Sequence, residues 1–288
     1  MTDIVCLLDA GAELGEGTLW DPVAQRLWWV DIWGKAIHCT DPETRNDKVF
    51  PTPDYVGCLG LRSKGGLVVT LADGFYFFDP ATNAYEKIID PEAHKPETRF
   101  NDGKTDRQGR FWSGTVFEAP PRPTEYIGAL YRLDPDLSCH CMVEGVGSSN
   151  GLAFSPDSRT MYFADSQGGF VWAWDFDPAT GDIDNRRVFI DFRPTGGCAD
   201  GATVDSEGCY WSTLPESGKL CRFDPDGRVM RTLVLPTSIP TCCEFGGKNL
   251  DILYVTSAKL RKLATPLAGA LFAIDVGVKG LTLPPFKG

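Results

Sequence analysis

Short stretches of alternating hydrophobic and polar residues run along the whole chain, and each stretch ends at a turn motif. In the commonest motif, a few strand-forming residues are followed by Asp and usually by Pro, as in Tyr76-Phe-Phe-Asp79-Pro80. Alternation with a period of two is typical of a half-buried β-strand, and Asp-Pro is typical of a type I turn. The six copies of this motif place their Asp at Asp41, Asp79, Asp134, Asp177, Asp224 and Asp275.

A second motif precedes most copies of the first and is typical of a β-hairpin. A turn residue is followed six or seven positions later by an aromatic residue, as in Asp106 and Trp112, or Asp205 and Trp211. Dividing the 288 residues among six repeats gives about 48 residues each, the length of a four-stranded propeller blade. We therefore predict an all-β fold: a six-bladed β-propeller with four antiparallel strands per blade, as a single domain over residues 1–288.

The composition agrees with a folded, turn-rich protein. The chain has 31 Gly and 21 Pro, a high share for a globular protein, and 42% of its residues are hydrophobic. A β-sandwich is the alternative fold, because it also has short strands and frequent turns. A sandwich has no reason to repeat six times, whereas radial repetition closes the stack of sheets without long exposed edges. The propeller is therefore the preferred interpretation.

The net charge of −11 argues against nucleic acid and anionic membranes as partners, because phosphate contacts need Lys or Arg. No basic run is longer than Arg261-Lys262. The first ten residues have no basic region, and their apolar run stops at Asp9, so we expect no signal peptide. No stretch approaches the ~18 apolar residues of a membrane span. The ten Cys are too few for a disulfide scaffold of this size, so we expect reduced, mostly buried thiols and a cytoplasmic protein.

One position of each repeat falls at the same end of the strand that lines the central channel. These positions are Glu16, Gly57, Asn101, Asn150, Asp200 and, in a looser register, Thr241. Four of them are carboxylates or amides, and inner strands that converge on one axis would bring these side chains together. Such a set offers oxygen donors only, which suits a hard divalent cation such as Ca²⁺ or Mg²⁺, and also Mn²⁺ or Zn²⁺. The alternative is that Asn-Gly and Asp-Gly are simply favoured turn dipeptides.

A second set of candidate residues surrounds Asn101. Arg99 lies two positions earlier in the same strand, so it should face the channel and could bind a substrate oxygen. Simple alternation directs Lys104 to the opposite face, where we expect a structural role. Glu118 precedes a Pro-rich loop and could reach over the mouth of the channel, although a lone acidic loop residue is more often only solvated.

Two other catalytic patterns are excluded. Gly147-Ser-Ser-Asn-Gly151 matches the G-x-S-x-G pattern, but the sequence after it predicts a strand and a turn instead of the required helix. The chain has three His, none in the context of a catalytic triad or of a multi-His zinc site. We therefore expect neither a serine hydrolase nor a zinc finger.

The motifs at these positions resemble the gluconolactonase family that includes regucalcin. The resemblance rests on Leu14-Gly-Glu-Gly-Thr-Leu-Trp20, Val30-Asp-Ile32, Arg99-Phe-Asn-Asp-Gly-Lys104, Ser149-Asn-Gly-Leu152, Asp200-Gly201, Asp205-Ser-Glu-Gly208 and Cys243-Glu-Phe-Gly-Gly247. It implies a six-bladed propeller that binds one divalent cation (Ca²⁺, Zn²⁺, Mn²⁺ or Mg²⁺) through Glu16, Asn150 and Asp200. It also implies substrate contact through Arg99 and Asn101, and hydrolysis of sugar-acid lactones.

Two segments depart from the family pattern. Family members often carry Pro before the last ligating Asp, whereas this chain has Ala199 there, in the run Gly196–Asp200. The loop Glu118–Thr124 is unusually rich in Pro. Both segments border the mouth, so we expect them to influence which lactone binds.

We therefore predict a metal-dependent lactonase that opens an aldonolactone, with Asp200 as catalytic general base and Arg99, Asn101 and Glu118 as substrate-binding residues. The expected partner is a small sugar lactone. The motifs do not identify which lactone or which metal binds, and they do not indicate an oligomeric state. The first alternative is a non-catalytic calcium-binding or regulatory propeller that uses the same oxygen donors. The second is a protein-interaction propeller, which would not depend on Glu16.

Overall fold

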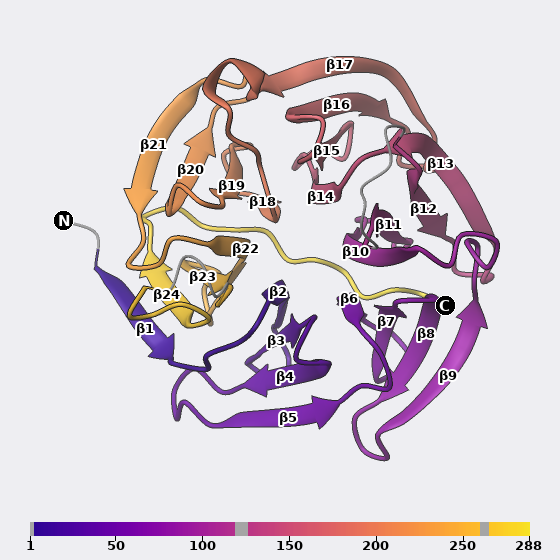
Figure 1. Cartoon of the computed structure of the whole chain (residues 1–288), viewed down its shortest axis with the longest axis horizontal. Coiled ribbons are helices and arrows are strands. Elements are labelled where there is room, and N and C mark those ends of the chain that lie inside the picture. Colours follow the sequence, from indigo (N-terminus) through magenta and orange to yellow (C-terminus); the bar gives the residue numbers. More distant parts are fainter. Residues whose placement is uncertain (1–2, 119–125, 260–264) are drawn as a thin grey trace.

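Six four-stranded antiparallel sheets surround a central axis in the computed structural model, which describes residues 3–118, 126–259 and 265–288 (Figure 1). The innermost strands are β2 (Gly15–Asp21), β6 (Val56–Leu61), β10 (Thr98–Thr105), β14 (Ser149–Phe154), β18 (Ala202–Val204) and β22 (Pro240–Gly246). The second strands are β3 (Arg26–Asp31), β7 (Leu67–Leu71), β11 (Phe111–Phe117), β15 (Thr160–Asp165), β19 (Tyr210–Leu214) and β23 (Ile252–Ser257). We number the blades 1 to 6 in this order.

The outer half of each blade completes the sheet. The third strands are β4 (Ala36–Thr40), β8 (Gly74–Asp79), β12 (Gly128–Leu133), β16 (Phe170–Phe176), β20 (Lys219–Phe223) and β24 (Leu271–Asp275). The outermost strands are β5 (Asp47–Pro51), β9 (Ala84–Ile89), β13 (Cys139–Val146), β17 (Ile183–Asp191), β21 (Val229–Val234) and β1 (Ile4–Leu8). The predicted all-β, six-bladed propeller is therefore confirmed. The helical content of the described residues is one 3₁₀ turn, Arg193–Thr195.

The ring closes because strands from the two ends of the chain pair in one blade. β1 pairs with β24, so the first strand of the sequence is the outermost strand of blade 6. Pairing between the two ends fastens the last blade to the first. Figure 1 shows β1 lying outside β24, next to blade 1.

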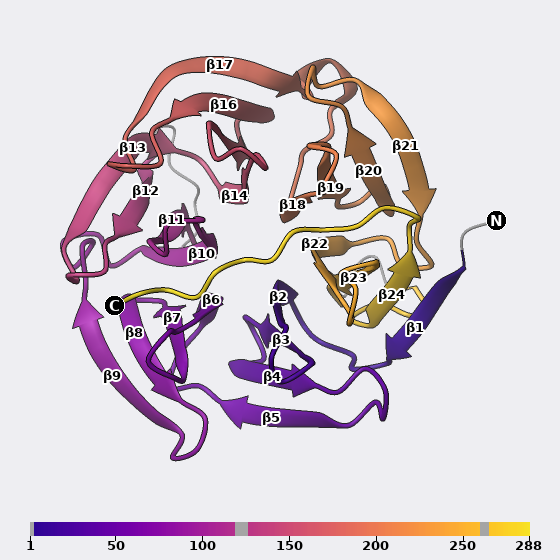
Figure 2. The same ribbon diagram turned by 180° about the vertical axis from the view of Figure 1, so that it is seen from behind.

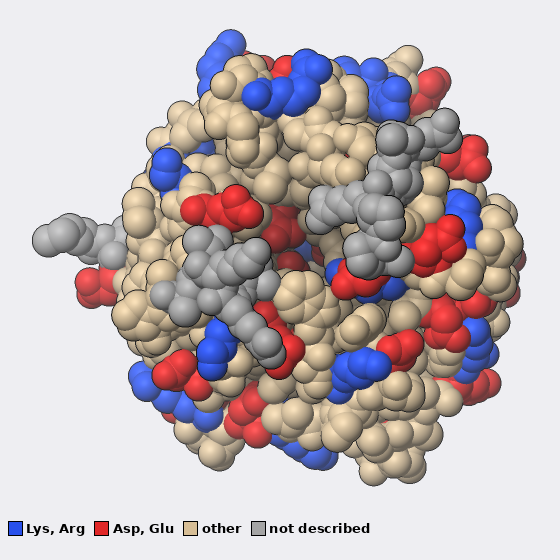
Figure 3. Space-filling view, viewed as in Figure 1, with Lys and Arg blue, Asp and Glu red and all other residues tan. Residues whose placement is uncertain are grey.

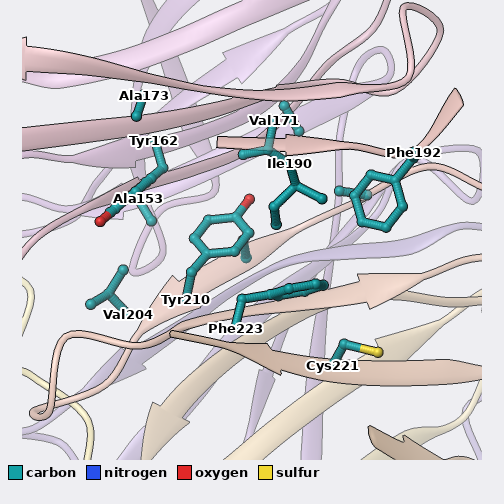
Figure 4. Close-up of a cluster of buried hydrophobic side chains, with 13 residues drawn as sticks. Ala153, Tyr162, Val171, Ala173, Ile190, Phe192, Val204, Tyr210, Cys221 and Phe223 are labelled. Atoms are coloured by element: carbon teal, nitrogen blue, oxygen red, sulfur yellow. The ribbon is translucent and has the colours of Figure 1, made fainter. Parts of the chain in front are cut away.

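The hydrophobic core lies between neighbouring blades, because the face of each sheet packs against the facing sheet of the next blade. Figure 4 shows one such interface, in which Tyr162 and Val171 of blade 4 face Tyr210 and Phe223 of blade 5. The inner strands are buried nearly throughout, whereas outer strands such as β21 alternate between partly buried and exposed residues. Burial on both faces explains why the inner strands are rich in apolar residues.

The last residues of the chain cross the lower end of the channel, the end away from the candidate site. The Ser206 amide donates to the Lys279 carbonyl (2.8 Å), the Phe286 amide to the Leu61 carbonyl (2.7 Å), and the Lys287 amide to the Gly109 carbonyl (3.0 Å). Figure 2 shows this segment spanning the ring from blade 6 towards blades 2 and 3. One end of the channel is thereby covered, and the other remains as the mouth.

The structure also bears on the cysteines and on membrane insertion. All ten Cys are unpaired, as expected, and half of them are buried. Within the described ranges there is no helix long and apolar enough to cross a bilayer.

Candidate active site

The inner strands place the predicted channel residues at the mouth end of the ring. Glu16 lies on β2, Asn101 on β10 and Asn150 on β14, and Asp200 lies two residues before β18. At this level the pairing register shifts between Glu16 and Leu19, and between Asn150 and Ala153. Such β-bulges redirect a side chain away from simple alternation. The mouth residues are therefore presented by irregular strand ends.

Two of the bulges require glycine. Gly17 and Gly151, which follow Glu16 and Asn150, have φ values of 58° and 57°. Residues with a Cβ rarely adopt this left-handed conformation. Gly201, which follows Asp200, has no left-handed φ; instead a Cβ there would lie 2.6 Å from the Cys242 Cα. The three glycines therefore serve two different purposes.

Glu16 and Asp200 are two carboxylates close enough to influence each other's ionisation. Burial raises the pKa of Glu16 well above its ordinary value, and the negative charges of Asp200 and Asp102 raise it further. Burial and the charge of Asp102 likewise raise the pKa of Asp200. The Glu16 side chain is 6% exposed and accepts a 3.2 Å hydrogen bond from the Gly17 amide. In the described part of the chain, no Lys or Arg forms an ion pair with either carboxylate.

Asp102 is a third buried carboxylate near the site, and the sequence analysis did not single it out. It accepts hydrogen bonds from the backbone amides of Gly103 (2.8 Å) and Leu152 (3.2 Å). Burial raises its pKa, and its charge acts on both Glu16 and Asp200. The sequence feature that could have identified Asp102 is its position directly after Asn101. The structure adds that the strand bulges there, between Phe100 and Gly103.

A chain of hydrogen bonds joins the predicted substrate residues to a predicted metal ligand. Arg99 Nη1 donates to Asn101 Oδ1 (2.7 Å), which confirms that these side chains share one face. Asn101 Nδ2 donates to Asn150 Oδ1 and to the Ser149 carbonyl (both 2.9 Å). Asn150 Nδ2 in turn donates to Ser166 Oγ (2.8 Å). Because both Asn101 N–H groups are engaged, its remaining capacity is that of an acceptor through Oδ1.

Glu118 reaches the mouth and is paired there. Arg99 Nε donates to Glu118 Oε2 (2.8 Å), and the indole Nε1 of Trp33 donates to Glu118 Oε1 (3.3 Å). Trp33 is 38% exposed, and the sequence analysis missed it because it lies in the turn between β3 and β4. The rest of the Pro-rich loop, residues 119–124, lies outside the described residues.

Lys104 does not face away from the channel, so the prediction of its direction is wrong. Its Nζ lies 2.6 Å from Glu244 Oε2 and donates to the Ala202 carbonyl (2.9 Å), which places it across the channel from its own strand. The bulge between Phe100 and Gly103 shifts the alternation of β10 by which Lys104 was assigned to the outer face. The resulting ion pair is buried below the mouth and joins blade 3 to blade 6.

The two other channel positions carry no free donor oxygen. A Cβ at Gly57 would lie 2.6 Å from the Asn101 carbonyl oxygen, so this position has no room for a side chain. The Thr241 hydroxyl donates to the Gly15 carbonyl and lies 3.0 Å from Thr256 Oγ1, and the residue is buried. Asp200 is supported instead by its own amide, which donates to the Thr213 carbonyl (3.0 Å).

The donor set suits a hard divalent cation. Glu16, Asn150 and Asp200 offer carboxylate and amide oxygens from three inner strand ends, and two mutually repelling carboxylates favour a cation between them. Figure 3 shows the mouth face, which is hollowed near the middle of the ring and has acidic side chains around the hollow. The residues present therefore fit a metal ion of the kind predicted.

Comparisons with known proteins agree with this arrangement. Residues 14–259 match the family described as SMP-30/Gluconolactonase/LRE-like region. The chain is 36% identical to a 6-deoxy-6-sulfogluconolactonase from Pseudomonas putida over 98% of both chains. It is 35% identical to regucalcin from Danio rerio, over 99% of this chain and 97% of the relative.

A solved structure gives the same result. The calcium-binding protein regucalcin from Agrobacterium tumefaciens superposes with a TM-score of 0.92, at 28% identity, over 98% of this chain and 96% of that chain. These matches confirm both the resemblance that the motifs predicted and the lactonase class that it implied: the chain belongs to the SMP-30/gluconolactonase/LRE-like family.

Proposed function

We propose that this protein is a metal-dependent hydrolase that opens a sugar-acid lactone to the free aldonic acid. The observation that carries the proposal is the pair of carboxylates, Glu16 and Asp200, at the mouth end of the channel. Burial and the negative charge of neighbouring carboxylates raise the pKa of both, and neither forms an ion pair with a described Lys or Arg. Asn150 adds a neutral oxygen at the same level. Names of the relatives, which include lactonases, support the reaction class.

The residues divide the chemistry between them. A divalent cation held by Glu16, Asn150 and Asp200 would supply Lewis acidity towards the lactone carbonyl oxygen. Asp200 acts as the general base and takes a proton from the attacking water. The water oxygen adds to the carbonyl carbon, the ring C–O bond breaks, and the proton passes from Asp200 to the departing ring oxygen. The product is an aldonic acid with a free hydroxyl.

Arg99, Asn101 and Glu118 hold the sugar. Arg99 Nη2 has no hydrogen-bond partner among the described residues, so it is available to a substrate oxygen. Asn101 Oδ1 accepts a hydrogen bond from a sugar hydroxyl, because its N–H groups are already used. Glu118 holds Arg99 from the rim and can accept from a second hydroxyl. A donor aimed at developing oxyanion charge is often worth about 100-fold or more in rate.

The first test measures acid release from a panel of aldonolactones in a pH-stat, using protein stripped with a chelator. The panel includes a lactone with an anionic group at C6, because one relative is named for such a substrate. Activity should be absent from the stripped protein and return with at least one of Ca²⁺, Zn²⁺, Mn²⁺ or Mg²⁺. Asp200→Asn should abolish lactone opening, whereas Asp226→Asn, at an exposed turn, should not. Full activity of folded Asp200→Asn would remove the base from the mechanism.

A second test addresses substrate handling. Arg99→Ala should lower kcat/KM by about 100-fold, whereas Arg187→Ala, on the outer surface of blade 4, should leave it unchanged. An unchanged kcat/KM for Arg99→Ala would place Arg99 outside the site.

A non-catalytic calcium-binding propeller is the second candidate function, favoured by the description of one structural relative as a calcium-binding protein. The same experiments separate the two functions. Ca²⁺ binding that depends on Glu16, with no lactone opening under any metal, would support the binding protein and reject the hydrolase.

A further inference from the structure

Two buried aspartates end the second strands of opposite blades. Asp31 is the last residue of β3 in blade 1, and Asp165 is the last residue of β15 in blade 4. Each is 8% exposed. Asp31 follows Glu16, and Asp165 follows Asn150, by the same interval of fifteen positions along the sequence. Each is paired in register with the residue that immediately precedes the proposed ligand, Gly15 or Ser149.

Asp31 binds the backbone that leads into Glu16. Its Oδ1 accepts hydrogen bonds from the amides of Leu14 and Gly34 (both 2.9 Å), and its Oδ2 accepts one from the amide of Glu13 (2.9 Å). A buried carboxylate that accepts three backbone N–H groups holds those groups firmly, because hydrogen bonds to a charged acceptor are strong. The segment before Glu16 is therefore tied to the end of β3.

Asp165 makes the same contacts, atom for atom. Its Oδ1 accepts from the amides of Ser148 (2.9 Å) and Gly168 (3.0 Å), and its Oδ2 accepts from the amide of Gly147 (3.1 Å). The three donors stand at the same sequence offsets from Asp165 as Leu14, Gly34 and Glu13 do from Asp31. Blades 1 and 4 thus present their proposed ligands through the same arrangement of hydrogen bonds.

Blades 1 and 4 share two further features of this arrangement. The residue after each Asp donates its amide to the backbone of the held segment: Ile32 to the Leu14 carbonyl (2.9 Å) and Ser166 to the Ser148 carbonyl (3.0 Å). The third residue after each Asp is Gly, and a Cβ there would lie 2.4 Å (Gly34) or 2.9 Å (Gly168) from the carboxylate. Glycine is thus required for the amide to reach the carboxylate.

Blades 2, 3 and 6 lack the carboxylate at the corresponding place. The partners of the residues before Gly57, Asn101 and Thr241 are Leu71, Thr115 and Ser257. The arrangement therefore occurs at Glu16 and Asn150, the two proposed ligands that are each followed by a glycine with a left-handed φ.

Aspartates at the opposite end of the blades behave differently. Asp106 accepts from the amides of Gln108 (2.9 Å) and Arg110 (3.0 Å) and from the Trp112 indole (3.1 Å). These contacts close a local turn, whereas Asp31 and Asp165 reach back to a segment 17 and 18 residues earlier. Asp106 is fully buried, so it is a matched control for the loss of a buried carboxylate.

We propose that Asp31 and Asp165 are paired positioning residues that hold Glu16 and Asn150 in place for the divalent cation. The proposal rests on the proposed metal site and names the residues that shape it. Outer residues that orient metal ligands typically contribute 10–100-fold to metal affinity. Replacing either Asp by Asn leaves one oxygen and turns an NH₂ group towards a backbone N–H, so the held segment is released.

The test is calorimetric titration of chelator-stripped protein with Mn²⁺, together with thermal melts of the metal-free variants. Asp31→Asn and Asp165→Asn should each weaken Mn²⁺ binding by about 10-fold or more. Asp106→Asn should lower the Tm by a similar amount but keep the Mn²⁺ Kd within about twofold of the wild type. In a Glu16→Gln background, Asp31→Asn should cause little further loss of affinity, because its effect acts through Glu16.

The outcomes separate this proposal from the proposed function. Wild-type protein that binds none of the divalent cations overturns both. Wild-type binding that Asp31→Asn and Asp165→Asn weaken no more than Asp106→Asn does overturns the positioning role alone. If Asp165→Asn does not fold, Gly168→Ala, which pushes a Cβ against the same carboxylate, must weaken Mn²⁺ binding, and an unchanged Kd counts against the proposal.

Discussion

At the scale of single residues, the site is defined by two buried carboxylates, Glu16 and Asp200, that form no ion pair with a described Lys or Arg. Glu16 and Asp200 are ionised at neutral pH only at a cost, because burial and the negative charge of neighbouring carboxylates disfavour the charged forms. A bound divalent cation removes that cost, so ion binding and protein stability should be coupled. The positive charge of Arg99 offsets only part of this cost for Glu16, and Arg99 forms its ion pair with Glu118.

The stability of the metal-free protein should respond to pH through these two groups. Their pKa is higher in the folded than in the unfolded chain, so the folded state binds more protons and stability falls as pH rises between the two values. Lowering the pH from 7 towards about 5 should therefore raise the Tm of the stripped protein. At pH 7, Asp200→Asn should raise that Tm by a few degrees, and added Mn²⁺ should stabilise the wild type only. A lower Tm for stripped Asp200→Asn would contradict this prediction.

Trp33 is predicted to act on the substrate through Glu118. Trp33→Phe removes the indole N–H that donates to Glu118 Oε1 and keeps most of the aromatic surface. We expect KM for the lactone to rise by about threefold to tenfold, with little change in kcat. Steady-state kinetics measure this split, and Trp172→Phe on the outer part of blade 4 is the control. Equal kinetics for both variants would leave Trp33 without a role.

At the scale of the strand, the inner-strand bulge decides where side chains point. β2 and β14 each bulge at the proposed ligand and place a left-handed glycine after it. β10 bulges between Phe100 and Gly103, which directs Lys104 into the channel. Alternation therefore predicts side-chain direction well along the regular parts of these strands and poorly across the bulge.

Gly17→Ala tests the bulge directly. The left-handed conformation costs about 1–2 kcal/mol for a residue with a Cβ, and the added Cβ would meet Val30 at 3.2 Å. We expect lower stability in urea unfolding and weaker Mn²⁺ binding, because Glu16 is displaced. Gly65 also has a positive φ, of 89°, but open space around it, so Gly65→Ala should lose stability without a change in metal affinity. Equal metal affinities for the two variants would argue against a role of the bulge.

At the scale of the whole molecule, contacts across the axis hold the blades together. β1 completes blade 6, and the last residues span the lower end of the channel (Figure 2). The Lys104–Glu244 ion pair joins opposite blades. Glu244 Oε1 also accepts from Thr203 Oγ1 (2.8 Å) and from the Phe245 amide (2.9 Å). The centre of the ring is therefore polar but well paired.

Breaking this ion pair on one side should be more harmful than removing it entirely. Lys104→Met leaves the Glu244 carboxylate buried without its cation and should cost about 3–5 kcal/mol in the free energy of unfolding. The double variant Lys104→Met, Glu244→Leu should recover part of that loss, because no buried charge remains. Urea unfolding of both single variants and the double variant measures the coupling. Strictly additive losses would show that the two residues act independently.

The sequence alone predicted the repeat, the all-β architecture and the level at which Glu16, Asn101, Asn150 and Asp200 meet. These features depend on local patterns: period-two alternation, turn residues and a fixed phase within each repeat. The direction of Arg99 was also predictable, because it lies in a regular part of β10.

The tertiary structure decided the features that depend on bulges and on contacts between distant segments. The Trp33–Glu118 hydrogen bond joins residues 85 positions apart, and the Lys104–Glu244 pair joins residues 140 positions apart. Neither follows from a local pattern, because the partners meet only when the ring closes. Only the structure shows that Asp31 and Asp165 make equivalent contacts. The sequence contains the equal spacing of fifteen residues from Glu16 to Asp31 and from Asn150 to Asp165, but it does not show that each carboxylate binds three backbone amides.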